Sequence, residues 1–410
     1  MPAPVRFIQL SDLHLGAPLA WLPLERRAER RREQQAALEA AVRLATEHAV
    51  DAILLPGDLF DLEGVDVETL AFAVHAFAWP GCPPVFIAPG NHDPSTTSSL
   101  SWNARLLGAR GWAWPEHVHV FRDAAWTAVA LADLPLTVWG RSFASSARSF
   151  ERPLAADTLP QAAAFDSGRV HVAVFHGSRE GVCPPAQAVT APFSVEEALA
   201  APFAYAAVGH YHRPSRIDDD RGTRLAYAGS AVALDVTETG AHGALLVTID
   251  DDGAARIEPL ELDARRAHAL DVDASGASSA ADIDRSILAA FEAAGVGERD
   301  IARVSVVGRI VRGVRYDAPG AELAARVFAL RVDVDGLRPD YDLDTIRARE
   351  PSTTEDRFVH ALLAELDAET DPERRARVLS AIYYDLDAFR LRDVAPAYEE
   401  LAEAREEIGA

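Results

Sequence analysis

The sequence contains no lysine, so all of its positively charged side chains are arginine. We attribute this to a compositional bias that also enriches alanine and aspartate. Cysteine occurs only at Cys82 and Cys183, which is too few for a disulfide framework or a zinc ribbon and favours a reducing cytoplasm. No apolar run reaches the roughly eighteen residues of a membrane span. Residues 1–4 lead into an apolar stretch without an export signal, so we expect a cytoplasmic protein without membrane segments.

The chain is strongly acidic, with a formal net charge of -23 over 410 residues. This balance argues against a large nonspecific nucleic-acid surface but leaves room for a local one. The length predicts two or three domains with ample core.

The first third of the chain alternates short apolar runs with helical patterns. Such a rhythm implies right-handed crossovers and a parallel sheet, with polar side chains gathered at the carboxyl ends of the strands. We expect strands over 6–10, 52–55 and 85–88, and helices over 25–48 and 66–78.

Shorter strands follow and are typical of a second sheet, packed in a sandwich with helices outside. They are expected over 118–121, 137–139, 170–175, 205–208, 225–228 and 245–249. We therefore predict an α/β domain over residues 1–262.

The rest of the chain is divided by composition. Residues 263–280 are rich in Ala, Ser, Asp and Gly and indicate a linker. A small α/β domain is expected within 263–345, from a helix over 282–294, a strand over 302–311 and a helix-to-strand unit over 321–333. Residues 339–351 are polar and have no continuous helical or strand pattern. Residues 346–410 form a helical C-terminal region, with helices expected over 355–367 and 372–407.

Five short runs end apolar stretches with metal-binding side chains. They are Ser-Asp12-Leu-His14, Gly-Asp58, Gly-Asn91-His92-Asp93, Phe-His176-Gly and Gly-His210-Tyr-His212. Residues two apart in an extended segment face the same side, so Asp12 and His14 are expected to reach one ion. The Asp58 carboxylate has two oxygens and can bridge two ions. Oxygen and imidazole donors suit manganese or iron, and also zinc, while the absence of a nearby thiolate disfavours a structural zinc site.

Each run alone has an ordinary structural explanation. An aspartate at the end of a strand is commonly a turn former or a helix cap, and a histidine in an apolar run is usually a packed residue. Five such runs in order, each closing an expected strand, are better explained by a paired-metal site for cleaving phosphate esters.

The ordered motifs resemble the calcineurin-like metallophosphoesterase superfamily. Within it, Ser11-Asp-Leu-His-Leu-Gly16, Gly57-Asp-Leu-Phe-Asp61 and Gly90-Asn-His-Asp93 are similar to the SbcD-type DNA repair exonucleases, particularly the YhaO-like branch. Tyr227-Ala-Gly-Ser230 and Gly243-Ala-Leu-Leu-Val247 also match that pattern. The resemblance implies a four-layer α-β-β-α sandwich, followed by a small α/β capping domain and a helical C-terminal tail.

The resemblance also implies how the ligands are divided between two divalent metal ions. One ion would take Asp12, His14, Asp58 and His212, and the other would take Asp58, Asn91, His176 and His210. Manganese is the expected metal, with iron, zinc or magnesium as alternatives. The pair would share a hydroxide, lower its pKa towards neutrality and withdraw charge from the phosphate.

His92 directly follows Asn91, which places it at the edge of the metals. From resemblance and geometry, we expect it to stabilise the transition state or to protonate the leaving oxygen. Asp93 would orient the imidazole, and its alternative role is a helix cap before Pro94.

Candidate substrate contacts come from two places. A cluster at 26–32 contributes Arg31 and Arg32, for which a solvated helix face is the alternative. Ser178 and Arg179 follow His176 directly. Three tryptophans, Trp102, Trp112 and Trp114, are candidates for stacking on bases, although packing in the core is the commoner role for such residues.

The function expected from these features is that of a metal-dependent DNA exonuclease, with endonuclease activity as an addition. It would act in DNA repair with a coiled-coil ATPase of the SbcC or YhaN type, on which the 372–407 helix would dock. The resemblance also implies a homodimer. Two alternatives remain: a phosphoesterase for a nucleotide or another small phosphodiester, and a non-catalytic, metal-stabilised scaffold for an ATPase.

Overall fold

The structure is a computed structural model. It describes residues 4–61, 65–182 and 188–391. Contacts between residues divide the chain into two compact units. The first comprises the described residues up to Leu270 together with Gly295–Arg303 and Ala324–Arg331, and the second comprises Asp271–Ala294, Val304–Leu323 and the described residues from Val332.

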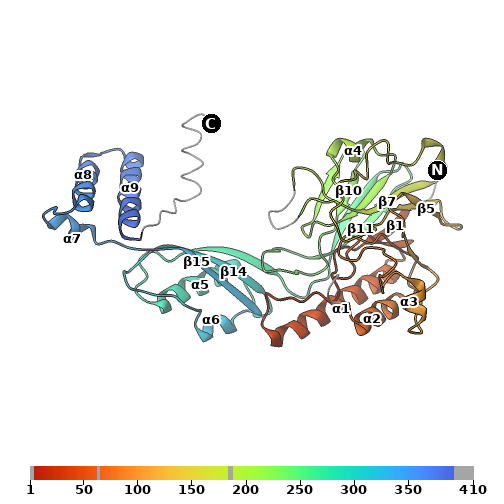
Figure 1. Cartoon of the computed structure of the whole chain (residues 1–410), viewed down its shortest axis with the longest axis horizontal. Coiled ribbons are helices and arrows are strands. Elements are labelled where there is room, and N and C mark those ends of the chain that lie inside the picture. Colours follow the sequence, from red (N-terminus) through yellow and green to blue (C-terminus); the bar gives the residue numbers. More distant parts are fainter. Residues whose placement is uncertain (1–3, 62–64, 183–187, 392–410) are drawn as a thin grey trace. The chain divides into compact units, whose positions relative to one another are not determined.

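The first unit contains two six-stranded sheets (Figure 1). In the first sheet, four consecutive strands are parallel to one another, and two strands from later in the chain extend the opposite side, the first antiparallel to the parallel strand beside it and the second antiparallel to the first. Its order is β12 (Ala255–Glu261), β11 (Gly243–Ile249), β1 (Val5–Gln9), β2 (Ala52–Leu55), β3 (Val85–Ile87) and β4 (Val118–Val120).

The second sheet has four parallel central strands and antiparallel strands at both edges. Its order is β5 (Thr127–Ala130), β6 (Leu136–Gly140), β7 (Val170–His176), β8 (Tyr205–Gly209), β10 (Thr223–Tyr227) and β9 (Ser215–Asp218). Two predictions are corrected here. The segments expected over 118–121 and 245–249 belong to the first sheet rather than the second, because β4 pairs with β3 and β11 pairs with β1.

Helices cover the outer faces of both sheets. The first sheet carries α1 (Leu24–Glu47), α2 (Val67–Phe77) and α3 (Ala104–Gly108), and the second carries α4 (Val195–Ala200) and a short 3-10 helix at Ala162–Ala164. Ile53 and Leu55 of β2 pack towards α1, whereas Ala52 and Leu54 pack between the sheets. This alternation explains why the central strands β1, β2, β7 and β8 are mostly apolar: each of them buries both of its faces, whereas edge strands such as β5 and β12 also have exposed residues. The four-layer α-β-β-α sandwich is confirmed.

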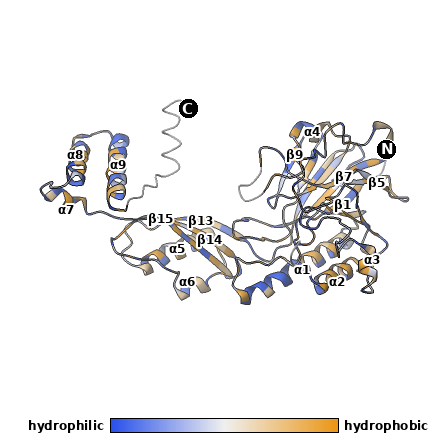
Figure 2. Cartoon of the chain, in the orientation of Figure 1, coloured by the Kyte–Doolittle hydropathy of each residue, from blue (hydrophilic) through white to orange (hydrophobic). Residues whose placement is uncertain are grey.

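A third sheet has the strand order β13 (Ala267–Asp273), β14 (Ile301–Ile310) and β15 (Ala329–Pro339). The linker expected over 263–280 is therefore wrong, because β13 lies inside it and alternates exposed with less exposed residues. Two helices connect these strands: α5 (Ala280–Ala294) lies between β13 and β14 in the chain, and α6 (Ala321–Ala325) lies between β14 and β15. Ile283, Ile287 and Phe291 are buried at helical spacing along α5. Figure 2 shows hydrophobic and hydrophilic residues interleaved along this helix.

The described part of the C-terminal region is helical. It contains α7 (Leu343–Ala348), α8 (Thr354–Ala368) and α9 (Pro372–Arg390), and α8 and α9 share a small apolar core with Tyr341. The buried carboxylate of Asp387 on α9 accepts hydrogen bonds from the Tyr341 hydroxyl (2.7 Å) and from Arg309 (2.8 Å). The remaining part of the helix expected over 372–407, from residue 392 on, lies outside the described residues. No helix among the described residues has the length and apolarity to cross a bilayer.

A buried ion pair fixes α1 within the first unit. The Arg30 side chain is fully buried and donates to both carboxylate oxygens of Asp263, at 2.7 and 2.6 Å, and to the Ala233 carbonyl at 2.8 Å. Asp263 also accepts the backbone N–H of Ala233. The geometry is bidentate, which favours the charged pair in a site without water.

We expect Asp263→Asn to lower the free energy of unfolding by about 3 kcal/mol, because the buried guanidinium then loses its bidentate counter-charge and keeps only Glu33, at 2.9 Å. Urea unfolding followed by circular dichroism measures this. Glu47→Gln is the matched control, since it removes a partner of the exposed Arg43–Glu47 pair on the same helix. It should change stability by less than about 1 kcal/mol. Equal effects of the two substitutions would contradict the role of Asp263.

Candidate functional site

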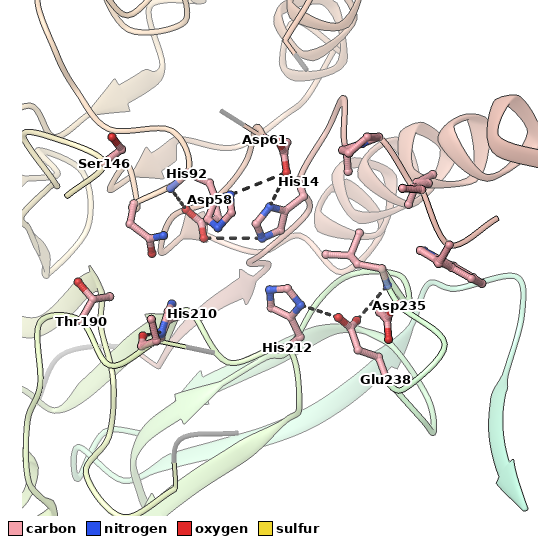
Figure 3. Close-up of a pocket in the computed structure, with 18 of the residues that line it drawn as sticks. His14, Asp58, Asp61, His92, Ser146, Thr190, His210, His212, Asp235 and Glu238 are labelled. Carbon is pink, nitrogen blue, oxygen red and sulfur yellow. Dashed lines mark hydrogen bonds and ion pairs between the residues drawn. The ribbon is translucent and has the colours of Figure 1, made fainter. Parts of the chain in front are cut away.

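Polar side chains follow five strands of the first unit at their carboxyl ends. Asp12, Asp58 and Asn91 come after β1, β2 and β3, while His176 ends β7 and His210 follows β8. Parallel strands bring these ends to one edge of the sandwich. Figure 3 shows His14, Asp58 and His92 facing His210 and His212 across a cavity.

The loops after the strands are sharply turned. Asp12, His14 and Asp58 have φ angles of 51°, 47° and 51°. The prediction that Asp12 and His14 form an extended pair is therefore wrong, although both side chains do reach one cluster. The loop after β1 runs along the loop after β2, and the His14 N–H donates to the Asp58 carbonyl at 2.9 Å. This pairing compensates for the uncommon φ values.

The expected ligands gather in two neighbouring clusters, and a third group of side chains, His14, Asp61 and His92, has its ligand atoms within 4.8 Å of one another and shares His14 with the first cluster. In the first, ligand atoms of Asp12, His14 and His212 lie within 4.8 Å of one another, and in the second those of Asp58, His176 and His210 do so. Asp58 lies between them, because its Oδ2 is 3.6 Å from His14 Nε2 and 3.2 Å from His176 Nε2. Asn91 joins the second cluster through its Oδ1, which lies 3.0 Å from His176 Nε2.

The clusters have the properties of cation sites. Asp12, Asp58 and His176 are almost fully buried. The buried Nε2 of His14 has no hydrogen-bond partner among the described residues. Buried polar atoms normally have partners, so this nitrogen points to a group that the protein chain does not supply. Carboxylate, amide and imidazole donors together fit divalent transition metals.

The electrostatics of the second cluster are dominated by Asp58. Burial disfavours its charged form, but the surrounding histidines outweigh burial and lower the pKa of Asp58. Burial acts in the opposite direction on His176, where the Asp58 charge outweighs it and raises the pKa to about 9. Burial, together with the charge of His176, lowers the pKa of His210 to about 3. The cluster therefore carries positive charge beside Asp58, where a cation fits in place of protons.

Two histidines are oriented by groups outside the clusters. His176 Nδ1 is 2.9 Å from the Pro56 carbonyl, which directs its Nε2 towards Asp58 and Asn91. His212 Nδ1 is 2.6 Å from Glu238 Oε1. The other oxygen of Glu238 accepts from the Ser230 hydroxyl and the Leu234 N–H, both at 2.9 Å. Such partners fix the tautomer of a metal-binding imidazole.

Sequence reasoning missed Glu238. It lies eight residues after Ser230 of the Tyr-Ala-Gly-Ser motif, in a loop without a spacing rule that would single it out. The sequence does not show which side chain contacts His212 Nδ1, because that contact depends on the path of the loop that carries Glu238.

His92 lies at the edge of the clusters, and its side chain is 45% exposed. Its ring centroid is 4.7 Å from that of His14, and its Nδ1 is 3.8 Å from Asp61 Oδ2. Burial lowers the pKa of His92. Asp61, the last residue of the Gly57–Asp61 motif, is a second residue whose place at the site sequence reasoning missed, although it belongs to a recognised motif.

The role expected for Asp93 requires a correction. Its carboxylate accepts backbone N–H groups from the β2 and β3 loops instead of orienting His92: those of Gly90 (2.7 Å), Leu59 (2.9 Å), Asp58 (3.2 Å) and Phe60 (3.3 Å). Asp93 is buried and ties the two loops together. The aspartate beside the His92 ring is Asp61.

Two glycines of the motifs are required by close packing. A Cβ added at Gly90 would lie 2.3 Å from Asp58 Oδ1, and one at Gly57 would lie 2.5 Å from His176 Nδ1. Gly57 also has a φ of 101°, which favours glycine. These glycines let the loops approach the buried carboxylate and imidazole.

A cavity of about 520 Å³ opens over the clusters. The four expected substrate contacts are not among its described lining residues. Arg31 donates to the Ala17 carbonyl, Arg32 to the Ala28 carbonyl of its own helix, and Arg179 to the Arg216 carbonyl, while the Ser178 hydroxyl accepts the Thr190 N–H. Among the polar residues that line the cavity away from the clusters are Ser146, Arg148 and Thr190.

The three tryptophans considered for stacking follow the packing alternative. Trp102 and Trp114 stack on each other at 5.6 Å, and their indoles donate to the carbonyls of Asp93 and Ser101. Trp112 packs against the core between α1 and the first sheet.

The chain is similar in sequence to several known proteins. The chain is 28% identical over 256 residues to the SbcD component of the nuclease SbcCD of Bacillus subtilis (58% of this chain, 64% of that protein). It is 27% identical over 254 residues to the uncharacterized metallophosphoesterase YhaO of Bacillus subtilis (59% and 57%). It is also 28% identical over 283 residues to the DNA double-strand break repair protein Mre11 of Methanopyrus kandleri (63% and 57%).

The matched region covers less than two thirds of each of these three relatives. The family model for the calcineurin-like phosphoesterases matches residues 5–214, which hold all of the strand-end residues described above. The cluster geometry and this match agree on one conclusion: the chain belongs to the calcineurin-like phosphoesterase family.

Proposed function

We propose that this protein is a metal-dependent nuclease that hydrolyses phosphodiester bonds of DNA. The observation that carries the proposal is the convergence of two buried ligand clusters on the shared Asp58 carboxylate. Family membership supports a phosphoesterase, the two clusters support a dinuclear site, and DNA as the substrate is the more specific part of the proposal. Two relatives support that part, since their names describe a component of a nuclease and a DNA double-strand break repair protein.

The proposed ligands are those expected from the motifs. One cation would be held by Asp12, His14, Asp58 and His212, and the other by Asp58, Asn91, His176 and His210. Manganese is the proposed metal, with iron, zinc or magnesium as alternatives, because the donors are oxygen and imidazole nitrogen. When bound, two such cations supply a water-derived nucleophile near neutral pH and neutralise phosphate charge.

His92 is proposed as the group that donates a hydrogen bond or a proton to the leaving oxygen. Its exposed position on the cavity wall supports contact with substrate. Asp61 lies on the Nδ1 side of the ring, which favours a protonated Nδ1 and directs Nε2 away from Asp61. The two residues would form an acid–base pair beside the cations.

The remaining domains are proposed to serve DNA binding and assembly. Residues 1–262 would form the nuclease domain, 263–345 a cap that shapes DNA entry, and 346–410 a segment that docks on an SbcC- or YhaN-like coiled-coil ATPase. The apolar core shared by α8 and α9 supports a stable hairpin for such docking. A homodimer, a cytoplasmic location and a role in DNA repair complete the proposal.

A small phosphodiester is the second candidate substrate. One observation favours it: the described lining of the cavity includes the acidic residues Asp58, Asp61, Asp235 and Glu238, with Arg148 as its one arginine. A long polyanion is repelled by such a surface more strongly than a small diester. Bound divalent cations would reverse part of this charge.

Asp58→Asn should impair both metal sites at once, because the substitution removes the charge that lies between the clusters. Titration calorimetry with manganese, and metal analysis after dialysis, should find fewer than two tightly bound ions per chain. His212→Asn is the comparison, since it should weaken one site only. Retention of two tight ions by Asp58→Asn would contradict the bridging role.

A substrate panel tests the function. Full-length protein with manganese should cleave labelled duplex or single-stranded DNA, and a chelator should abolish the activity. His92→Ala is the matched negative control: it should keep both ions and lose turnover by about a hundredfold or more. Cleavage of only a small phosphodiester would favour the second candidate, and no cleavage by the metal-loaded protein with an ATPase partner and ATP would favour a scaffold.

Arg148→Ala should weaken DNA binding, because Arg148 is the arginine that lines the cavity. We expect KM for DNA to rise several-fold and the dependence of KM on salt to become shallower, as when one phosphate contact is lost. Arg32→Ala is the control, since Arg32 is exposed on α1 and donates within its own helix. If Arg32→Ala had the larger effect, the contact expected from the sequence would be the correct one.

A further inference from the structure

The cavity over the clusters has two unlike ends. Figure 3 shows Ser146 and Thr190 at one end and Asp235 and Glu238 at the other, with the histidines between them. Next to Asp235 the wall becomes apolar, and it is formed by Ala17, Pro18, Leu19, Ala20, Trp21 and Leu234. A phosphate and two cations do not use such a wall, and a volume of about 520 Å³ leaves room beyond them.

Trp21 differs from the other tryptophans whose indole contacts are known. The indoles of Trp102, Trp114, Trp126 and Trp139 each donate to a protein acceptor. The buried Nε1 of Trp21 has no acceptor among the described residues, although the ring lines the cavity. Buried indole N–H groups usually have a partner. The ring packs against the apolar cluster that contains Leu19 and Leu22, and its N–H is left for a group that the described residues do not supply.

The loop that carries Trp21 is held rigidly by α1. Arg27 donates to the carbonyls of Leu22 (2.8 Å) and Ala20 (3.1 Å), and Arg31 donates to that of Ala17 (3.3 Å). Leu22 is buried in an apolar cluster of the same unit. Arginines of the cluster expected to hold phosphate thus position this loop. A rigid loop loses little conformational entropy when a ligand binds, so it offers a preorganised surface.

We propose that Trp21 and the apolar wall beside it form a nucleobase subsite, in which the base next to the scissile phosphate stacks on the indole. The proposal rests on the proposed function and names the recognised part of the substrate. A nucleotide fits because its base has a flat π-face that can stack on the indole, while its sugar and phosphate oxygens can accept from the indole N–H, which lies in the plane of the ring. The hydrocarbon part of a lipid phosphodiester has no such π-face. Every base has a π-face, so the subsite would tolerate all sequences.

The test compares two diesters that differ only in the base. One is the p-nitrophenyl ester of deoxyadenosine 5′-monophosphate, and the other is the same ester of the abasic 1,2-dideoxyribose 5-phosphate. For the full-length protein with manganese, we expect kcat/KM to be about tenfold or more higher for the ester with a base. Equal values for the two esters would overturn the proposal.

Substitutions then assign the preference to Trp21. Trp21→Ala should lose the tenfold preference and leave hydrolysis of the abasic ester unchanged, whereas Trp21→Phe should keep most of the preference by retaining an aromatic face. Trp79→Ala is the matched control, because Trp79 is 56% exposed and is not among the lining residues of the cavity. Circular dichroism and manganese titration check that each variant is folded and binds metal. An equal loss on both esters in Trp21→Ala and Trp21→Phe would indicate a merely structural residue and overturn the proposal.

A binding measurement separates this proposal from the proposed function. Calorimetry on the manganese-loaded protein should give deoxyadenosine 5′-monophosphate about tenfold or more tighter binding than 2-deoxyribose 5-phosphate, and Trp21→Ala should remove the difference. If neither diester nor DNA is cleaved but this difference is found, the nuclease function fails and the base subsite stands. If DNA is cleaved and the difference is missing, the subsite fails and the function stands.

Discussion

The buried carboxylate of Asp58 is the feature on which the site depends. It lies between two clusters of imidazoles and has almost no exposure to solvent. A buried carboxylate is costly unless opposite charge and hydrogen bonds surround it. The histidines supply the charge, and Asp58 Oδ1 accepts the His92 N–H at 2.9 Å. The imidazoles that stabilise the carboxylate are also the side chains that would bind a cation on either side of it.

The surrounding loops can be understood as support for that one group. Asp93 accepts four backbone N–H groups from the loops after β2 and β3, and Gly57 and Gly90 remove the side-chain atoms that would collide with His176 and Asp58. Glu238 braces His212 from the opposite side. Charged groups in the support are themselves buried, so each needs its own partners, and the network extends outward until it reaches backbone.

The arginines of α1 belong to this support. Arg30 fixes α1 to the segment after β12 through Asp263, and Arg27 and Arg31 hold the carbonyls of the loop that follows His14. From the sequence, the positive charge near the start of this helix suggested phosphate binding. A sequence shows which residues are close along the chain but not where their side chains point. In the fold these guanidinium groups instead donate to nearby backbone carbonyls and carboxylates.

The sequence by itself determined the strand ends and the residues that gather there, because apolar runs closed by Gly, Asp, Asn and His mark the carboxyl ends of parallel strands. It also indicated the sandwich, since both faces of the central strands are apolar. Only the tertiary structure decided the partners across long separations: β11 joining β1, Glu238 facing His212, Asp61 rather than Asp93 beside His92, and Trp21 rather than Trp102 on the cavity wall. Such contacts depend on loop paths and packing, and no periodicity in the chain encodes them.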